Sequence, residues 1–161
     1  MSEPRLAGTE HLVTSPLALS CTWQEGRLTR IRLHIPAQGQ RSSLLSEWGE
    51  VLLHSLETYA DGKPTAWPAL PLAWTTVPPF ARTVLEALAQ TVGWGEWTTY
   101  GGLAQACGRP KAARAVGRIM SCNPWPLVVP CHRVLGAGKQ LGGFSSGLDQ
   151  KRLLLGLENI L

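Results

Sequence analysis

Residues 123–135 read Asn123-Pro124-Trp125-Pro126-Leu127-Val128-Val129-Pro130-Cys131-His132-Arg133-Val134-Leu135. The segment is apolar, is framed by three prolines and ends with a cysteine directly before a histidine. Because proline fixes φ and donates no backbone hydrogen bond, we expect a rigid, extended chain that finishes as a strand near Cys131. A free thiol ionises near pH ~8.5, so a thiolate at neutral pH needs a base or a positive charge beside it. His132 and Arg133 are the local candidates, and the segment therefore indicates a nucleophilic cysteine held at a fixed angle.

The same segment is compatible with a structural cysteine, because cysteine is among the most buried residue types in proteins. Asn123 upstream and Glu158 downstream add polar groups that favour chemistry. On the residues alone, both interpretations stay open.

The N-terminal part of the chain reads as a small α/β unit. Two strand-like runs, residues 12–23 and 28–34, flank a turn at Gly26, and the second alternates apolar and polar residues, which predicts a hairpin with one buried face. Residues 44–59 repeat apolar side chains at helical spacing, and the Asp-Gly-Lys-Pro sequence at 61–64 ends that helix. The helical stripe comprises Leu44, Leu45, Trp48, Val51, Leu52, Leu56 and Tyr59. Nothing in this part suggests chemistry, so we interpret it as a scaffold.

Prolines mark a linker in the middle of the chain. Five of them lie between residues 60 and 79, at Pro64, Pro68, Pro71, Pro78 and Pro79. We therefore expect an N-terminal domain over residues 1–75 and a C-terminal domain over residues 76–161.

The C-terminal domain reads as mainly α-helical. Residues 80–90 carry an apolar stripe that predicts a core-packing helix. A threonine cap predicts a short helix over 101–107, and after a stop at Gly108 a second helix over 110–121 begins with Pro110. Two short helices joined by a glycine turn predict a helix-turn-helix.

Positive charge gathers in the same region. The formal net charge is +4, but residues 1–75 hold six Lys/Arg and seven Asp/Glu, whereas residues 76–161 hold nine and four. Residues 97–148 contain no acidic residue and six basic ones: Arg109, Lys111, Arg114, Arg118, Arg133 and Lys139. This stretch predicts contact with a phosphate backbone, with a solvated basic face as the alternative.

Cysteine and hydropathy patterns argue against metals, disulfides and membranes. The four cysteines are scattered, and neither a Cys-x-x-Cys pair nor a clustered Cys/His set suggests zinc. The sequence holds no apolar run of membrane-spanning length and no secretory leader. We expect a soluble, cytoplasmic protein with no metal and no cofactor.

The motifs together resemble those of a known family. One motif, Pro130-Cys131-His132-Arg133-Val134, is preceded by Asn123-Pro124 and followed by Gly143-Phe144-Ser145 and a leucine-rich helix ending in Glu158. This arrangement resembles the active site of O6-alkylguanine-DNA alkyltransferases. The resemblance continues upstream through Thr99-Tyr100-Gly101 and Lys111-Ala112-Ala113-Arg114-Ala115-Val116-Gly117, and covers residues 78–161.

The resemblance implies both fold and function. It implies an N-terminal α/β domain with a small ribonuclease-H-like sheet and a helix, and a C-terminal domain that binds DNA and accepts the alkyl group. The reaction implied is direct, single-turnover transfer of an alkyl group from O6-alkylguanine in double-stranded DNA to Cys131, with O4-alkylthymine as a further candidate substrate. It also implies a monomer at the nucleoid, with assembly on DNA left open.

The catalytic residues implied are Cys131, His132, Glu158, Asn123 and Tyr100. Glu158 orients and polarises His132, which takes the thiol proton through a water before Cys131 attacks the alkyl carbon. Asn123 connects the helix-turn-helix to the cysteine segment, and Tyr100 supports rotation of the nucleotide out of the stack.

The DNA contacts implied come from the second short helix. Arg114 fills the hole left by the flipped base, with Ala113, Lys111 and Arg118 around it. The small side chains on this helix leave a thin face, which suits the narrow minor groove. The flipped base is expected in a pocket formed by Trp125, Val134 and the glycine-rich loop over residues 142–147, which includes Phe144, Ser145 and Ser146.

Three other classes are considered. A non-catalytic, lesion-binding repair sensor shares the helix-turn-helix and the arginine, but carries tryptophan where this chain has Cys131. A cysteine hydrolase using Cys131, His132 and Glu158 would give the arginine no purpose, and a plain DNA-binding module would give the cysteine none.

Overall fold

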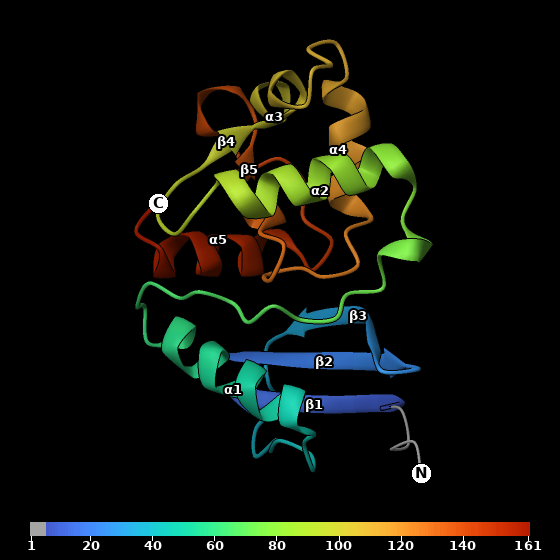
Figure 1. Cartoon of the computed structure of the whole chain (residues 1–161). Helices are drawn as coiled ribbons and strands as arrows, with labels where there is room; N and C mark the ends of the chain where they lie inside the picture. Colours follow the sequence, from blue (N-terminus) through green and yellow to red (C-terminus); the bar gives the residue numbers. More distant parts are fainter. Residues whose placement is uncertain (1–5) are drawn as a thin grey trace. The chain divides into compact units, whose positions relative to one another are not determined.

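The computed structural model describes residues 6–161, and the chain divides into two compact units between Ala73 and Trp74 (Figure 1). The first unit holds strands β1 (Gly8–Thr14), β2 (Leu17–Gln24) and β3 (Arg27–His34), followed by helix α1 (Glu47–Ala60). The strands form one antiparallel sheet in the order β1-β2-β3. The predicted hairpin is therefore wrong in one respect, because the first run breaks at Ser15 and Pro16 into two strands. Proline cannot donate a ladder hydrogen bond, so a turn is favoured there.

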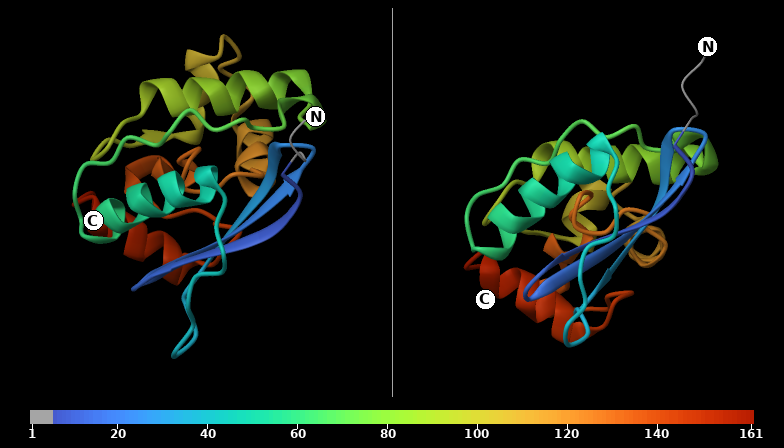
Figure 2. Two further views of the ribbon diagram at one scale, coloured as in Figure 1. Left: turned by 60° about the horizontal axis from the view of Figure 1, so that its bottom comes forward. Right: turned by 90° about the horizontal axis from the view of Figure 1, so that it is seen from below.

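Helix α1 lies against one face of this sheet (Figure 2). The side chain of Ser46 caps the helix by accepting a hydrogen bond from the Gly49 amide at 3.1 Å, and Asp61 ends it. The buried positions are Gly49, Leu52, Leu56 and Tyr59.

The predicted apolar stripe of this helix is partly wrong. Leu44 precedes the helix and is 97% exposed, while Trp48 and Val51 are 37% and 48% exposed. Successive helical residues are about 100° apart, so positions one residue away from the buried stripe turn toward solvent.

The second unit contains four α-helices and a short parallel pair of strands. The helices are α2 (Pro79–Thr91), α3 (Tyr100–Ala106), α4 (Ala113–Ser121) and α5 (Leu148–Leu157), and the strands are β4 (Thr98–Thr99) and β5 (Val134–Leu135). Three 3-10 turns complete it: η1 (Trp74–Thr76), η2 (Cys131–Arg133) and η3 (Ala137–Lys139). No helix in residues 6–161 is long and apolar enough to span a membrane.

Two boundaries in this unit differ from the sequence predictions. Helix α4 begins at Ala113, because Pro110 and Lys111 belong to a turn that the Ala112 amide closes on the Arg109 carbonyl at 2.9 Å. The predicted strand before Cys131 is also absent from the described structure. Leu127 adopts a φ of +76°, and the Val129 amide donates back to the Trp125 carbonyl at 2.9 Å, so the segment forms a turn.

Candidate active site

A cavity of about 560 Å³ opens in the second unit, with Cys131 in its wall. Its lining comes from α3, α4, Cys131 and the loop over residues 142–145: Tyr100, Ala113, Arg114, Gly117, Met120, Ser121, Cys131, Gly142, Gly143, Phe144 and Ser145. The volume lies within the range of small-ligand pockets, about 300–1,000 Å³. The fold thus brings residues from four separate parts of the sequence around one thiol.

Cys131 begins η2 and is 3% exposed. Burial raises the pKa of its thiol, while a hydrogen bond from the Asn123 side chain and the charge of Lys151 act in the opposite direction. Asn123 also donates from Nδ2 to the Val129 carbonyl at 2.9 Å and accepts from the Trp125 amide at 3.0 Å. Asn123 comes after Cys122, the residue that caps the end of α4, so it connects that helix to the segment that carries the thiol.

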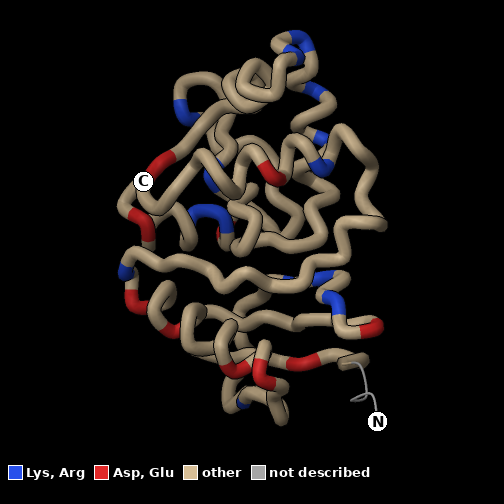
Figure 3. Tube along the Cα trace, in the orientation of Figure 1, with Lys and Arg blue, Asp and Glu red and all other residues tan. Residues whose placement is uncertain are grey.

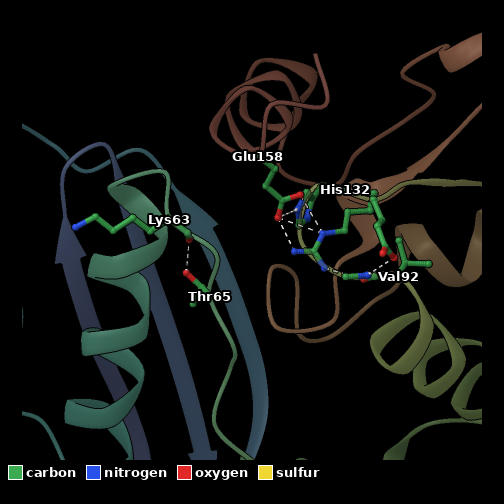
Figure 4. A network of polar contacts seen from close by, with 8 residues as sticks. Lys63, Thr65, Val92, His132 and Glu158 are labelled. Atoms are coloured by element: carbon green, nitrogen blue, oxygen red, sulfur yellow. Dashed lines mark hydrogen bonds and ion pairs between the residues drawn. The ribbon is translucent and has the colours of Figure 1, made fainter.

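The two residues after Cys131, His132 and Arg133, form a buried network with Glu158 (Figure 4). His132 Nε2 is 3.3 Å from Glu158 Oε1. Arg133 donates from Nε to both Glu158 oxygens at 3.1 and 3.0 Å, from Nη2 to Oε1 at 2.5 Å, and from Nη1 to the Val92 carbonyl at 2.8 Å. One carboxylate therefore serves the histidine and the arginine together.

The network sets the charge state of both titratable groups. Burial alone would raise the pKa of Glu158, but the hydrogen bonds from His132 and Arg133 outweigh it and lower that pKa to about 2. Burial lowers the pKa of His132, and the charges of Arg133 and Lys151 lower it further against the opposing effect of Glu158. At neutral pH the carboxylate is charged and the imidazole is neutral, which is the state in which a histidine accepts a proton.

Lys151 is a site residue that sequence analysis missed. It lies on α5 with no exposed surface, and Nζ donates to the carbonyls of Val134 at 2.9 Å, Gly143 at 3.2 Å and Leu141. Burial lowers its pKa to about 8, and the negative charge of Cys131 opposes that shift. Lysine is rarely buried and helical lysines are normally solvated, so the sequence carries no local signal for this role.

Tyr100 opens α3 beneath the cap that Thr99 provides, where Thr99 Oγ1 accepts from the Gly102 amide at 2.9 Å. Burial and the negative charge of Cys131 both raise the pKa of the Tyr100 phenol. A Cβ placed on Gly142, whose φ is +64°, would lie 2.6 Å from the Tyr100 hydroxyl. Glycine at 142 therefore lets the loop approach this tyrosine closely.

The basic residues divide into two groups. Arg114 is exposed and lines the cavity, as does Ala113, whereas Lys111 and Arg118 are exposed but do not line it. Figure 3 shows Lys and Arg gathered along the turn before α4 and on that helix. An exposed cationic helix therefore borders the mouth of the cavity.

Several predicted pocket residues lie elsewhere. Trp125 is fully buried with its ring edge-on to Trp74 at a centroid distance of 4.8 Å, and Val134 is fully buried with its carbonyl bound to Lys151. Ser146 does not line the cavity either, whereas Phe144 and Ser145 do.

Three lining residues were not predicted: Gly117, Met120 and Ser121. Their spacing carried a usable signal, because residues three, four and seven apart share one helix face with Ala113 and Arg114. Across residues 6–161, no group of three or more His, Cys, Asp or Glu side chains is arranged to hold a metal ion.

Comparisons with known proteins point in one direction. The sequence model of the family described as 6-O-methylguanine DNA methyltransferase, DNA binding domain, matches residues 79–160. The chain is 52% identical over 79 residues to a methylated-DNA--protein-cysteine methyltransferase of Mycolicibacterium paratuberculosis, covering 49% of this chain and 47% of that protein. It is 40% identical over 106 residues to the protein of the same name from Haemophilus influenzae, covering 66% and 58%. The matched segments thus span about half the length of these curated relatives.

The structural likeness extends over both units. A crystal structure of Mycobacterium tuberculosis OGT in complex with DNA resembles this chain with a TM-score of 0.77 and 30% identity, covering 94% of this chain and 93% of that one.

Proposed function

Because this chain belongs to the 6-O-methylguanine DNA methyltransferase family, we propose that it repairs DNA by transferring the alkyl group of O6-alkylguanine to its own Cys131. The observation that carries this proposal is the cavity itself, which joins a thiol, a tyrosine and an exposed arginine on a cationic helix. Double-stranded DNA carrying the lesion is the proposed partner. The DNA complex of the M. tuberculosis relative supports that partner.

The proposed DNA-binding element is the α3–α4 pair acting as a helix-turn-helix. Gly108, with a φ of +75°, turns the chain between the two helices. The α4 face carries Ala113 and Gly117 beside Arg114, a thin face suited to the minor groove. Arg114 fills the space left by the extruded nucleotide, because its planar guanidinium stacks where the base had been. Lys111 and Arg118 bind the backbone phosphates.

The extruded base enters the cavity and meets the thiol. Tyr100 and the loop over residues 142–145 form its walls, and Phe144 supplies an apolar surface. Lys151 fixes this loop by holding the carbonyls of Leu141 and Gly143. The alkyl carbon is thereby positioned over Cys131, which is the geometric requirement for displacement.

The chemistry is displacement at the alkyl carbon. The thiol proton passes to His132, whose charged form Glu158 stabilises, and the thiolate attacks. The new carbon–sulfur bond forms as the bond to guanine O6 breaks, and its electron pair stays on the guanine, which takes up the proton that His132 received from the thiol. The thioether that remains has no acyl carbonyl for water to attack, so each molecule reacts once.

The N-terminal unit acts as a scaffold in this proposal. Its three antiparallel strands and single helix support the ribonuclease-H-like assignment.

The test is intact mass after incubation with a duplex that carries one O6-methylguanine. We expect a gain of one methyl group that saturates at one per molecule and maps to Cys131. Cys131→Ala should gain nothing, whereas Cys122→Ala, which removes an exposed thiol, should react like the wild type. Tight binding to the lesion without any mass change would instead identify a non-catalytic lesion sensor.

A further inference from the structure

The first unit carries a second hollow, of about 410 Å³, over its sheet. It is lined by Thr9, His11, Ser20, Thr22, Arg32, Leu33 and His34. Strand register explains its polar residues, since His11, Ser20 and Arg32 form one cross-strand row. Thr9 and Thr22 form the next row with Arg30, which lies beside the hollow in register but does not line it. We call these two rows together with His34 the polar sheet face.

The opposite face of the same sheet belongs to the core. Leu19, Cys21 and Ile31 alternate with the polar residues and are buried. Glu10 follows the same alternation, and its carboxylate accepts a hydrogen bond from the Ser46 hydroxyl at 3.1 Å. The nearest carboxylate in the strand sequence is therefore directed away from the polar sheet face.

The polar sheet face has the chemistry of an anion site. Within residues 6–161, neither Arg30 nor Arg32 forms an ion pair with a carboxylate, and both are exposed. Hydroxyl groups on the neighbouring strands lie in the same rows, with His11 Nδ1 3.1 Å from Ser20 Oγ and Thr9 Oγ1 3.3 Å from Thr22 Oγ1. Arginine side chains and serine and threonine hydroxyls are among the groups that contact phosphate oxygens in nucleic-acid complexes.

We propose that the polar sheet face binds phosphate groups of a DNA backbone, so that the N-terminal unit is a second DNA contact and more than a scaffold. The choice of ligand rests on the proposed DNA-repair function. Two guanidinium groups on adjacent rows, neither paired with a carboxylate of the described residues, match successive backbone phosphates, because each neutralises one charge and binds in a planar, forked geometry. Such contacts carry no base specificity, as suits a protein that meets lesions in any sequence.

The test is the salt dependence of binding to a short, unmodified DNA duplex, measured by fluorescence anisotropy with the full chain. The loss of one phosphate contact makes the negative slope of log K against log salt shallower by about 0.9. Over a fourfold rise in salt, the wild type should therefore lose about 3.5-fold more affinity than Arg32→Gln. Arg30→Gln/Arg32→Gln should double the change in slope.

Two further variants act as controls. Lys63→Gln removes the same charge from the same unit, at an exposed lysine 3.7 Å from Asp61, and should keep the wild-type slope. Arg32→Lys retains the positive charge and should also keep the wild-type slope, which distinguishes a loss of charge from a folding defect caused by replacing Arg32. Equal slopes for the wild type and Arg32→Gln, or an equal reduction in Lys63→Gln, would overturn the inference.

Methyl transfer to Cys131, assayed on the same preparations at saturating duplex, keeps the two proposals separate. If methyl transfer occurs but Arg32→Gln has the wild-type salt slope, only the proposed second DNA contact is refuted. If the slope changes but no methyl transfer occurs, only the proposed alkyl transfer is refuted.

Discussion

Arg133 is the residue whose replacement should most clearly show how the buried network is held together. Its guanidinium meets both oxygens of a carboxylate that is 2% exposed, and Nη1 also binds the Val92 carbonyl. Arg133→Met removes the cation and leaves the Glu158 charge buried beside His132. Breaking a buried ion pair from one side costs about 3–5 kcal/mol in the free energy of unfolding. Domains of this size have about 5–15 kcal/mol in total, so we expect a large fraction of the stability to be lost.

The same variant should change the response to acid. In the wild type, the folded pKa of Glu158, about 2, lies below its unfolded value, so the unfolded state binds more protons between the two. This stability is present above about pH 4.3 and is lost as the pH falls toward 2, with a magnitude of about 3 kcal/mol. Without Arg133, the folded pKa of Glu158 rises toward its unfolded value. The acid-dependent loss should then shrink.

Urea unfolding at about pH 7, 5, 4 and 3 measures both effects. Arg152→Met is the matched control, since Arg152 lies on α5 in an exposed pair with Asp149 at 3.3 Å and should contribute less than about 1 kcal/mol. Arg133→Met/Glu158→Gln should recover part of the loss, because the buried charge disappears with its partner. A loss below about 1 kcal/mol in Arg133→Met, or an unchanged acid dependence, would refute this account of the network.

Two other substitutions test the cavity. Lys151→Met removes a cation that favours the Cys131 thiolate, so single-turnover methyl transfer should slow. The slowing should be strongest below pH 8, where Lys151 is charged in the wild type, and the rate difference between the two proteins should narrow above pH 8. A rate ratio that stays constant with pH would argue against the electrostatic role. Gly142→Ala should cost about 1–3 kcal/mol in urea unfolding and slow transfer, because the new Cβ meets the Tyr100 hydroxyl at a positive φ. Gly117→Ala lies inside α4, and its Cβ would be 3.9 Å from the Tyr100 ring, so it should be about 1 kcal/mol more stable than the wild type because alanine is the better helix former. Equal losses in both variants would contradict the steric argument.

Much of the cavity was predictable because its residues lie in short, ordered motifs. Cys131, Tyr100 and Arg114 carry the family resemblance, and the structure places all three around one cavity. Helix caps were also readable, since the threonine cap before α3 depends on local hydrogen bonds alone.

The failures come from positions that local sequence does not determine. Proline fixes φ but leaves ψ free, so prolines at 124, 126 and 130 allowed a turn as readily as a strand, and Leu127 completes that turn with a positive φ. Helix α4 begins at Ala113 and not at Pro110 as predicted from the preference of proline for the first helical turn, because the turn after Gly108 includes Pro110 and Lys111. The burial of Lys151 depends on three carbonyls, of Val134, Leu141 and Gly143, that reach it through tertiary folding.

The arrangement of charges around Cys131 suggests how a buried thiol becomes reactive. Burial favours the neutral forms of both the thiol and the His132 imidazole, so the resting pair carries no charge. Moving the proton between them creates a thiolate and an imidazolium in a medium of low dielectric, where fixed charges act strongly. Lys151 is placed to stabilise the thiolate and Glu158 the imidazolium, while Arg133 keeps Glu158 ionised. We infer that the pair stays neutral until a substrate draws the proton transfer forward, which would protect a thiol that we propose reacts only once from adventitious reaction.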